Sequence, residues 1–223
     1  MTNNPLENTK GNNVKRKSVA REYAEAIFIA LLLALFIRTF VIQAFKIPSG
    51  SMEETLLIGD HILVSKFAYG THIPNEIPFF NIKLFNDIIF FSKLPERGDI
   101  IVFKYPKDET RDFIKRVIGV PGDLLEVKHQ KVFINGKPYI DSFARHIESP
   151  SDTPLVPRDD FGPVLVPDGH LFMMGDNREN SQDSRYWGFL DVNKVRGKAL
   201  IIYWSWNQLE NWVRFERFGK ILE

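Results

Sequence analysis

The hydrophobic pattern of this chain changes abruptly near residue 46. Before that point lies one long apolar run, residues 26–37, that contains no charged side chain. Continued through Arg38 to Phe45, it forms a segment, 22–45, that as a helix is long enough to cross the hydrocarbon core of a bilayer. A helix that is apolar on all sides does not suit a soluble protein. The pattern therefore predicts one N-terminal transmembrane helix.

A cleaved signal peptide and a buried helix are the alternatives for this segment. Cleavage requires small residues at the first and third positions before the cut, and Ile42-Gln43-Ala44 has a large residue at the third. The preceding residues, 1–21, carry five basic side chains against one acid, which predicts a disordered basic tail. Because basic residues flank the cytoplasmic end of a membrane helix, we expect the N-terminus in the cytoplasm and the chain after residue 45 outside it.

Beyond residue 46 the helical period disappears, and short β-type runs alternate with turn residues. These runs lie at 100–103, 113–120, 124–127, 132–134, 171–174 and 199–204. Asn135-Gly136 follows one of them and predicts a tight hairpin. The spacing is typical of a mainly β, antiparallel domain, which we expect over residues 46–223.

Two stretches interrupt that domain. Residues 71–96 are broken by prolines and predict either a hairpin over the core or a loop that dips into the membrane interface. Residues 141–167 combine prolines with polar residues and predict a loop-rich insertion.

Composition excludes several kinds of chemistry. The chain has 223 residues, a net charge of +1 and no cysteine. A disulfide framework, a thiolate nucleophile and a cysteine-based metal site are therefore impossible. The histidines show no metal-ligand spacing, and the near-neutral charge gives no reason to expect a nucleic-acid partner. We expect no metal, no cofactor and no nucleic acid.

The turn directly after the apolar segment carries two serines. Pro48-Ser49-Gly50-Ser51-Met52 can present a hydroxyl beside free backbone N–H groups, but by itself this composition is typical of a plain turn. A nucleophilic serine also requires a base. The five histidines, at positions 61, 72, 129, 146 and 170, lie in no recognisable catalytic motif.

A lysine made neutral by burial is the other available base. Lys115 and Arg116 interrupt the apolar β run 113–118. Successive residues of a strand point to opposite faces, so one of the two cations must lie on an apolar face. The spacing does not choose between them, and it leaves open a lysine that reaches solvent from an edge strand.

Together these motifs resemble the successive boxes of bacterial type I signal peptidases. The boxes follow in the family's order as Pro48 to Met52, Gly59-Asp60 to Lys66, Arg97-Gly98-Asp99 to Lys115-Arg116, and Gly175-Asp176-Asn177-Arg178 to Arg185. The pattern is most similar to the Gram-negative branch, whose members carry insertions between the boxes. The resemblance implies an antiparallel β catalytic domain of the signal-peptidase and repressor-protease type. It also implies a membrane-bound serine endopeptidase that removes signal peptides from secretory pre-proteins at the outer face of the inner membrane.

The resemblance implies a Ser/Lys dyad. Ser51 matches the family's nucleophile and Lys115 its general base. Ser49 matches a side-chain donor that joins the Ser51 backbone N–H in the oxyanion hole. The other matching residues are Ser181, whose hydroxyl would orient the lysine, and Asp183 and Arg185, which would form a supporting salt bridge.

Two positions depart from the family's pattern. Glu54 stands two residues after Met52, where the family usually has proline, and we expect it to change the rigidity of the turn and to add charge near the site. Phe113 stands where the family often has tyrosine.

The resemblance also implies how a substrate binds. The precursor segment before the cut would add as a β-strand between residues 45–52 and 112–115. Shallow apolar pockets would accept small side chains at the first and third positions before the cut, as in Ala-X-Ala. The residues that match these pockets, all of which are also candidate core residues, are Phe45, Ile47, Met52, Leu56, Val102, Phe113 and Ile114.

Two other classes share part of this pattern. A self-cleaving repressor-type protease has the same dyad, but it also has a DNA-binding helical domain, for which residues 1–45 leave no room. A non-catalytic, membrane-tethered β domain that binds exported proteins would lack a dyad residue, and all are present. We therefore expect a single-pass monomer in contact with membrane lipid, with a periplasmic catalytic domain.

Overall fold

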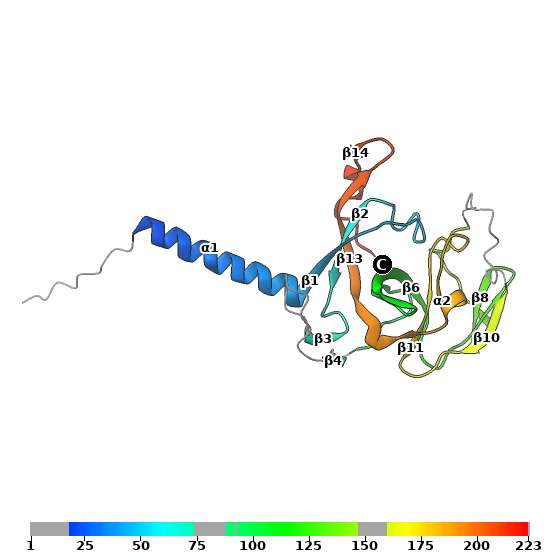
Figure 1. The fold of residues 1–223 in the computed structure, drawn as a ribbon. Helices are drawn as coiled ribbons and strands as arrows, with labels where there is room; N and C mark the ends of the chain where they lie inside the picture. Colours follow the sequence, from blue (N-terminus) through cyan, green and yellow to red (C-terminus); the bar gives the residue numbers. More distant parts are fainter. Residues whose placement is uncertain (1–17, 74–87, 92, 147–159, 223) are drawn as a thin grey trace, which may run out of the picture. The chain divides into compact units, whose positions relative to one another are not determined.

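The computed structural model describes residues 18–73, 88–91, 93–146 and 160–222 (Figure 1). The chain divides into two compact units, Met1–Ile37 and Arg38–Glu223. The basic residues at 10, 15, 16 and 17, and the centres of both predicted interruptions, 74–87 and 147–159, lie outside the described residues.

The first unit contains helix α1, Val19–Phe36. Ser18 caps its N-terminus by accepting a hydrogen bond from the Arg21 backbone N–H. The prediction that the polar tail extends to residue 21 is therefore wrong at its last positions. Among the described residues, no helix combines the length and the apolar character needed to span a membrane.

The prediction of a continuous helix to Phe45 is also wrong. A π-helical turn, η1 (Ile37–Val41), follows α1, and strand β1 (Ile42–Lys46) comes next. β1 pairs with β2 (Asp60–Ser65) from Ile42↔Ser65 to Lys46↔His61. Pairing with a distant strand supplies hydrogen-bond partners that local sequence does not reveal, so an apolar run that resembles helix becomes an edge strand.

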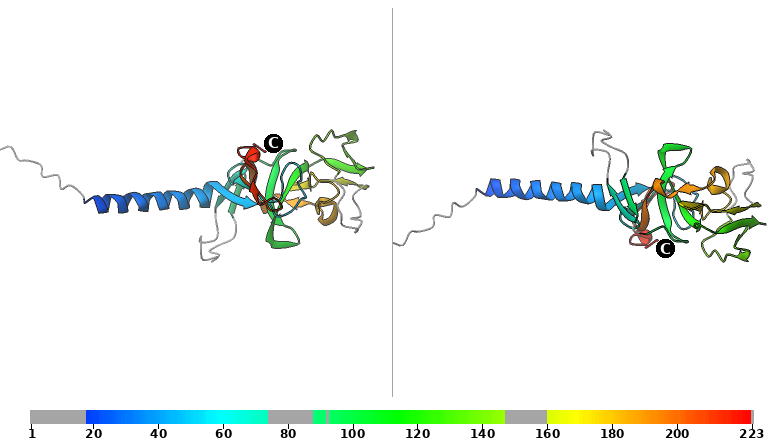
Figure 2. Two further views of the ribbon diagram at one scale, coloured as in Figure 1. Left: turned by 90° about the horizontal axis from the view of Figure 1, so that it is seen from above. Right: turned by 90° about the horizontal axis from the view of Figure 1, so that it is seen from below.

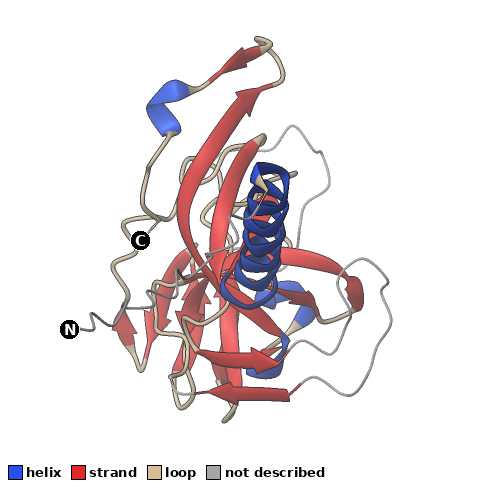
Figure 3. Ribbon diagram, turned by 90° about the vertical axis from the view of Figure 1, so that its left-hand side faces the viewer, coloured by secondary structure: helices blue, strands red, loops and turns tan. Residues whose placement is uncertain are grey.

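The second unit is built on a curved eight-stranded sheet (Figures 1 and 3). Its strands follow the order β1-β2-β13-β5-β6-β11-β12, β14 pairs with β13, and every pair is antiparallel. The mainly β, antiparallel prediction is confirmed. The further strands are β5 (Ile100–Tyr105), β6 (Asp108–Gly119), β11 (His170–Met174), β12 (Leu190–Asp191), β13 (Val195–Asn207) and β14 (Trp212–Val213).

A four-stranded sheet of order β10-β7-β8-β9 lies at the end of this unit opposite β1 (Figure 2). Asn135 and Gly136, with φ of 54° and 77°, form the predicted tight hairpin. β10 corrects the loop-rich prediction for 141–167: its Pro163 is tolerated because the strand is at the edge and its register shifts between Phe161 and Val164. The strands are β7 (Leu124–Lys128), β8 (Lys131–Ile134), β9 (Lys137–Pro138) and β10 (Phe161–Leu165).

The ends of the first predicted interruption form a hairpin, β3 (Gly70–Ile73) with β4 (Ile88–Phe91). Three short helices complete the described chain: α2 (Ser184–Trp187), η2 (Val192–Lys194) and η3 (Phe215–Arg217).

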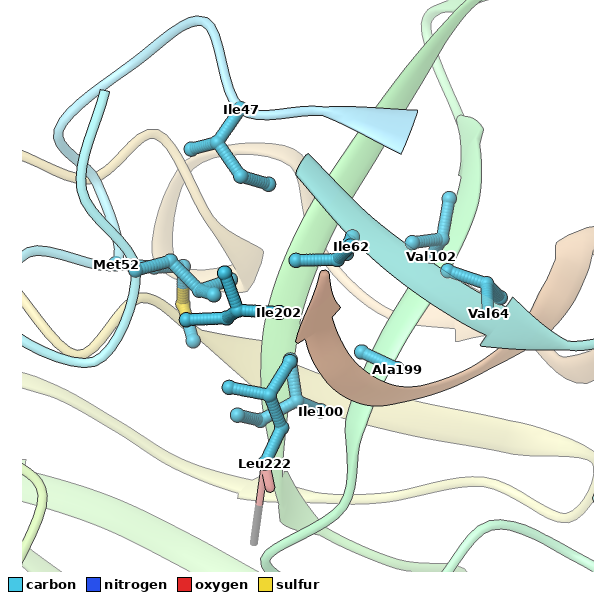
Figure 4. Close-up of a cluster of buried hydrophobic side chains, with 10 residues drawn as sticks. Ile47, Met52, Ile62, Val64, Ile100, Val102, Ala199, Ile202 and Leu222 are labelled. Atoms are coloured by element: carbon cyan, nitrogen blue, oxygen red, sulfur yellow. The ribbon is translucent and has the colours of Figure 1, made fainter. Parts of the chain in front are cut away.

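Strand alternation distributes the core over both faces of the larger sheet. Ile100 and Val102 of β5 pack in one apolar cluster, and Ile101 and Phe103 pack in a second on the other face. The first cluster gathers side chains from the turn after β1 and from β2, β5 and β13 (Figure 4). Met52, one residue after Ser51, is fully buried in it. The position of Ser51 is thus tied to the packing of the core.

Candidate active site

The turn that carries Ser51 is held at both of its ends. The Ile47 N–H donates to Asp60 O, and the Gly59 N–H donates to Ile47 O. Within the turn, the Leu56 N–H donates to Met52 O at 2.7 Å. This network fixes the backbone, so Ser51 is positioned although the turn belongs to no helix or strand.

The curvature of the larger sheet brings Ser51 to Lys115. Ser51 follows the edge strand β1, and Lys115 lies in β6, with β2, β13 and β5 between them in the sheet order. Lys115 Nζ nevertheless lies 2.7 Å from Ser51 Oγ and also donates to Ile114 O at 2.9 Å. The two residues are 8% and 4% exposed. A buried hydroxyl and a buried amine therefore share one hydrogen bond.

Burial prepares this lysine to act as a base. Burial lowers the pKa of Lys115 from its ordinary value of 10.5 to about 8, although the Asp183 and Asp176 carboxylates act in the opposite direction. Desolvation has this effect because it disfavours the charged ammonium. At that pKa a useful fraction of the amine is neutral near neutral pH. The alternative of a lysine that reaches solvent from an edge strand is wrong.

Both members of the Lys-Arg pair are buried, on opposite faces of β6. Arg116 is fully buried, and its Nε and Nη2 donate to the Asp176 carboxylate at 2.9 and 2.8 Å. Its Nη1 donates to Gly98 O. The Thr55 hydroxyl donates to the same carboxylate at 2.6 Å. Asp176 thus connects β6 to the turn that carries the serine, a role that the sequence motif did not reveal.

The Asp183–Arg185 salt bridge is present. The Asp183 carboxylate accepts from Arg185 Nε and Nη2, both at 2.8 Å, and from the Gly175 N–H at 3.1 Å. Burial alone would raise the pKa of Asp183, but the Arg185 charge and these hydrogen bonds outweigh it, and the pKa lies below its ordinary value. The resulting carboxylate fixes the loop before Ser181.

Ser181 is close to the nucleophile but is not bonded to the lysine. Its hydroxyl is buried and forms no hydrogen bond with any residue that the structure describes. A Cβ added to Gly175 would lie 2.3 Å from Ser181 Oγ and 2.4 Å from Ser51 O. Ser181 and Ser51 therefore pack against the same glycine.

The Ser51 backbone N–H is free to bind an oxyanion. It donates to no residue in the described part of the chain, whereas Ser51 O accepts from the Asn177 N–H at 3.2 Å. The Asn177 side chain also donates to Gly50 O. Ser49 is exposed beside this turn, and its hydroxyl has no hydrogen-bond partner among the described residues.

No histidine side chain that the structure describes is bonded to Ser51. The His61 and His170 rings contact the carbonyls of Gly59 and Asp168, and His146 lies 3.8 Å from Glu179. In the same part of the chain, no group of His, Asp and Glu side chains is arranged to hold a metal ion.

The residues predicted to line the substrate pockets fall into two groups. Ile47, Met52, Leu56 and Val102 are at most 2% exposed and belong to the first core cluster. The partly buried residues are Phe45 and Ile114, which pack against that cluster, and Phe113, which stacks on Tyr105. Their role in binding substrate stays a prediction.

Two strand edges beside the dyad are unpaired in the described chain. β6 pairs with β5 from Asp108 to Arg116, but with β11 only from Arg116 to Gly119. Its edge over 108–115 therefore faces no described strand. β1 pairs only with β2 among the described strands. Unpaired edges of this kind can accept an extended peptide as an added strand.

Comparison with known proteins places the chain in a family. A family model described as "Signal peptidase, peptidase S26" matches residues 20–204. A signal peptidase I of Pseudomonas fluorescens is 34% identical over 90% of this chain and 78% of its own length. One of Aquifex aeolicus is 35% identical over 83% of this chain and 84% of its own. A crystal structure of a signal peptidase I from Enterococcus faecalis aligns at 32% identity with a TM-score of 0.39, covering 48% of this chain and 97% of that one.

Proposed function

The chain belongs to the signal peptidase family, peptidase S26, and we propose that it removes signal peptides from secretory pre-proteins with Ser51 as nucleophile and Lys115 as general base. The observation that carries this proposal is the buried 2.7 Å contact between Lys115 Nζ and Ser51 Oγ. Family membership favours this function over a self-cleaving repressor and over a non-catalytic binding domain.

The reaction proceeds through an acyl-enzyme. Neutral Lys115 takes the Ser51 proton as Oγ attacks the scissile carbonyl, and the resulting ammonium gives that proton to the leaving amine of the mature protein. Water then attacks the ester, and Lys115 accepts one of its protons. The ammonium gives that proton to Ser51 Oγ, and the signal peptide leaves as a carboxylic acid that loses its proton to solvent. The same pKa serves both halves of the cycle because it lies near working pH.

Charge on the tetrahedral intermediate is stabilised by the Ser51 N–H, with the Ser49 hydroxyl as second donor. Each such donor contributes roughly 10²–10³ in rate when it is aimed at the developing oxyanion. The exposure of Ser49 leaves its hydroxyl free to turn toward a bound substrate. The Asp183–Arg185 pair holds the loop before Ser181.

The substrate segment before the cut adds as a strand between the free edges of β1 and β6. Partly exposed Phe45, Phe113 and Ile114 flank this position and limit the adjacent substrate side chains to small ones. Cleavage therefore follows an Ala-X-Ala sequence. A bulky residue at either alanine position blocks processing. Equal turnover of pre-proteins with alanine and with leucine at these positions would contradict the proposed pockets for small side chains.

The apolar run 26–37 holds the enzyme at the inner membrane, with the basic N-terminus cytoplasmic and the β domain periplasmic, as a monomer.

The test is incubation of the full-length protein, in detergent micelles, with a secretory pre-protein, followed by N-terminal sequencing of the product. We expect a single cut after Ala-X-Ala that is absent in Ser51→Ala. The proposal fails if the pre-protein stays intact, or if the same cut appears with Ser51→Ala.

A further inference from the structure

Glu54, three residues after the nucleophile, has an ion-pair partner in a distant loop. Glu54 Oε2 lies 2.5 Å from Arg145 Nε, and the two side chains are 59% and 42% exposed. The backbone of Glu54 has a φ of 40°, in the left-handed region that non-glycine residues rarely occupy. The residue in this unfavourable backbone conformation, Glu54, is thus the one that forms the ion pair.

The guanidinium of Arg145 is itself fixed. Its Nη1 donates to Ser142 O and Ala144 O, each at 3.0 Å. These bonds hold the guanidinium with its Nε directed toward Glu54. A side chain that is held by further hydrogen bonds loses less rotamer entropy in forming an exposed ion pair than a free side chain does.

The main chain of Arg145 reaches the nucleophile by a second route. The Arg145 N–H donates to Asp176 O at 2.7 Å, and the Arg178 N–H donates to Arg145 O at 2.8 Å, which forms a parallel bridge between Arg145 and Asn177. Asn177 in turn donates to Ser51 O. Arg145 is therefore connected to the Ser51 turn twice, through its side chain to Glu54 and through its backbone by way of residues 176–178.

The loop that presents Arg145, residues 141–146, is anchored on the site by two further contacts. Asp141 forms a buried ion pair with Arg178. The Phe143 ring covers the Arg116 guanidinium at 3.7 Å from its centroid. This loop is thus a rigid support for the turn.

We propose that Arg145 is a positioning residue, which through its ion pair with Glu54 holds the Ser51 turn so that Oγ stays within reach of Lys115 Nζ. The inference rests on the proposed function. Arg145 acts through Glu54 and touches neither Ser51 nor Lys115. Loss of the pair frees the strained Glu54 backbone to relax and lets Ser51 leave the reactive geometry. The expected effect is on kcat and not on KM.

A double-mutant cycle tests the proposal in the full-length protein. An exposed ion pair changes an equilibrium by about fivefold at most. We expect Arg145→Ala and Glu54→Ala each to lower kcat for a pre-protein by about two- to fivefold, and the double variant to be no slower than the worse single variant. Lys128→Ala removes a similar exposed pair with Glu126, remote from the site, and should leave kcat unchanged.

Amide hydrogen exchange of residues 49–57 gives a readout that does not depend on cleavage. Both single variants should exchange faster there than the unmodified protein, whereas Lys128→Ala should not. Additive losses in kcat, or unchanged exchange in both single variants, overturn the proposal. Absence of cleavage by the unmodified protein would instead refute the proposed function, and the exchange data would still decide on the pair.

Discussion

Lys115 Nζ lies 2.7 Å from Ser51 Oγ although 64 residues separate the two in the chain. The contact depends on the curvature of the sheet, because three strands lie between β1 and β6 in its order. Neither partner is identified by composition or strand periodicity alone. Their chemistry arises from their common burial.

The pH dependence of cleavage follows from the lowered pKa of Lys115. The base acts only when neutral, so kcat/KM should rise about tenfold per pH unit below about pH 8 and level off above it. The measurement is initial rates on a pre-protein from pH 5 to pH 10. A profile centred near the ordinary pKa of histidine, about 6.5, would point to another base.

The same burial costs stability. In the unfolded chain Lys115 titrates at its ordinary 10.5, and in the folded protein at about 8. Between these values the unfolded state binds the extra proton, so stability rises with pH through this window and the full penalty is present below it. Lys115→Met should therefore raise the free energy of unfolding at pH 7 by at most about 3 kcal/mol.

The gain from Lys115→Met should shrink between pH 8 and pH 10.5 and disappear above it. Denaturant unfolding of both proteins at several pH values checks this. A gain that is constant across the window would contradict the titration account.

Asp176 depends on its partner on β6. Arg116→Met leaves a fully buried carboxylate with only Thr55 as a side-chain donor. Breaking a buried pair in this way costs about 3–5 kcal/mol, and denaturant unfolding measures it. Arg97→Met, which removes a partly exposed pair with Asp123, serves as the control. An equal loss of unfolding free energy in the two variants would mean that burial does not determine the cost of breaking the pair.

The glycine before Asp176 should tolerate no side chain. An added Cβ at Gly175 would lie 2.4 Å from the Ser51 carbonyl, a backbone atom. Gly175→Ala should therefore displace Ser51 and lower kcat even at temperatures where the variant remains folded, as its measured Tm shows. Gly122→Ala, at a position with φ of 85° and nothing within 4 Å, imposes backbone strain alone and should leave kcat unchanged. Full activity of Gly175→Ala would rule out this packing.

The β architecture could be predicted because strand alternation and turn residues are local signals. β1 could not, since Ile42–Lys46 continues an apolar run and becomes a strand only by pairing with β2. Alternation likewise left Lys115 and Arg116 undecided. Both are buried in the structure. The carboxylate that neutralises Arg116 belongs to Asp176, 60 residues away in the chain, so the local sequence does not reveal it.

The roles at the site were implied by resemblance to a family and not by local pattern. The structure adds contacts that neither source contained. Glu54 was expected to alter the stiffness of the turn, and its partner Arg145, 91 residues away, could not be found from sequence. A proline at position 54 would not fit this backbone, because its φ is restricted to about −65°.

The Ser51–Lys115 dyad is tested most directly by single-turnover cleavage of a pre-protein by Lys115→Ala at pH 8, with the unmodified protein and Ser51→Ala alongside. Circular dichroism of each variant verifies that the fold is retained. Loss of a positioned base costs about 10²–10⁴ in rate, so we predict at least a hundredfold loss for Lys115→Ala and no cleavage by Ser51→Ala. Cleavage by Lys115→Ala at the rate of the unmodified protein would contradict the dyad.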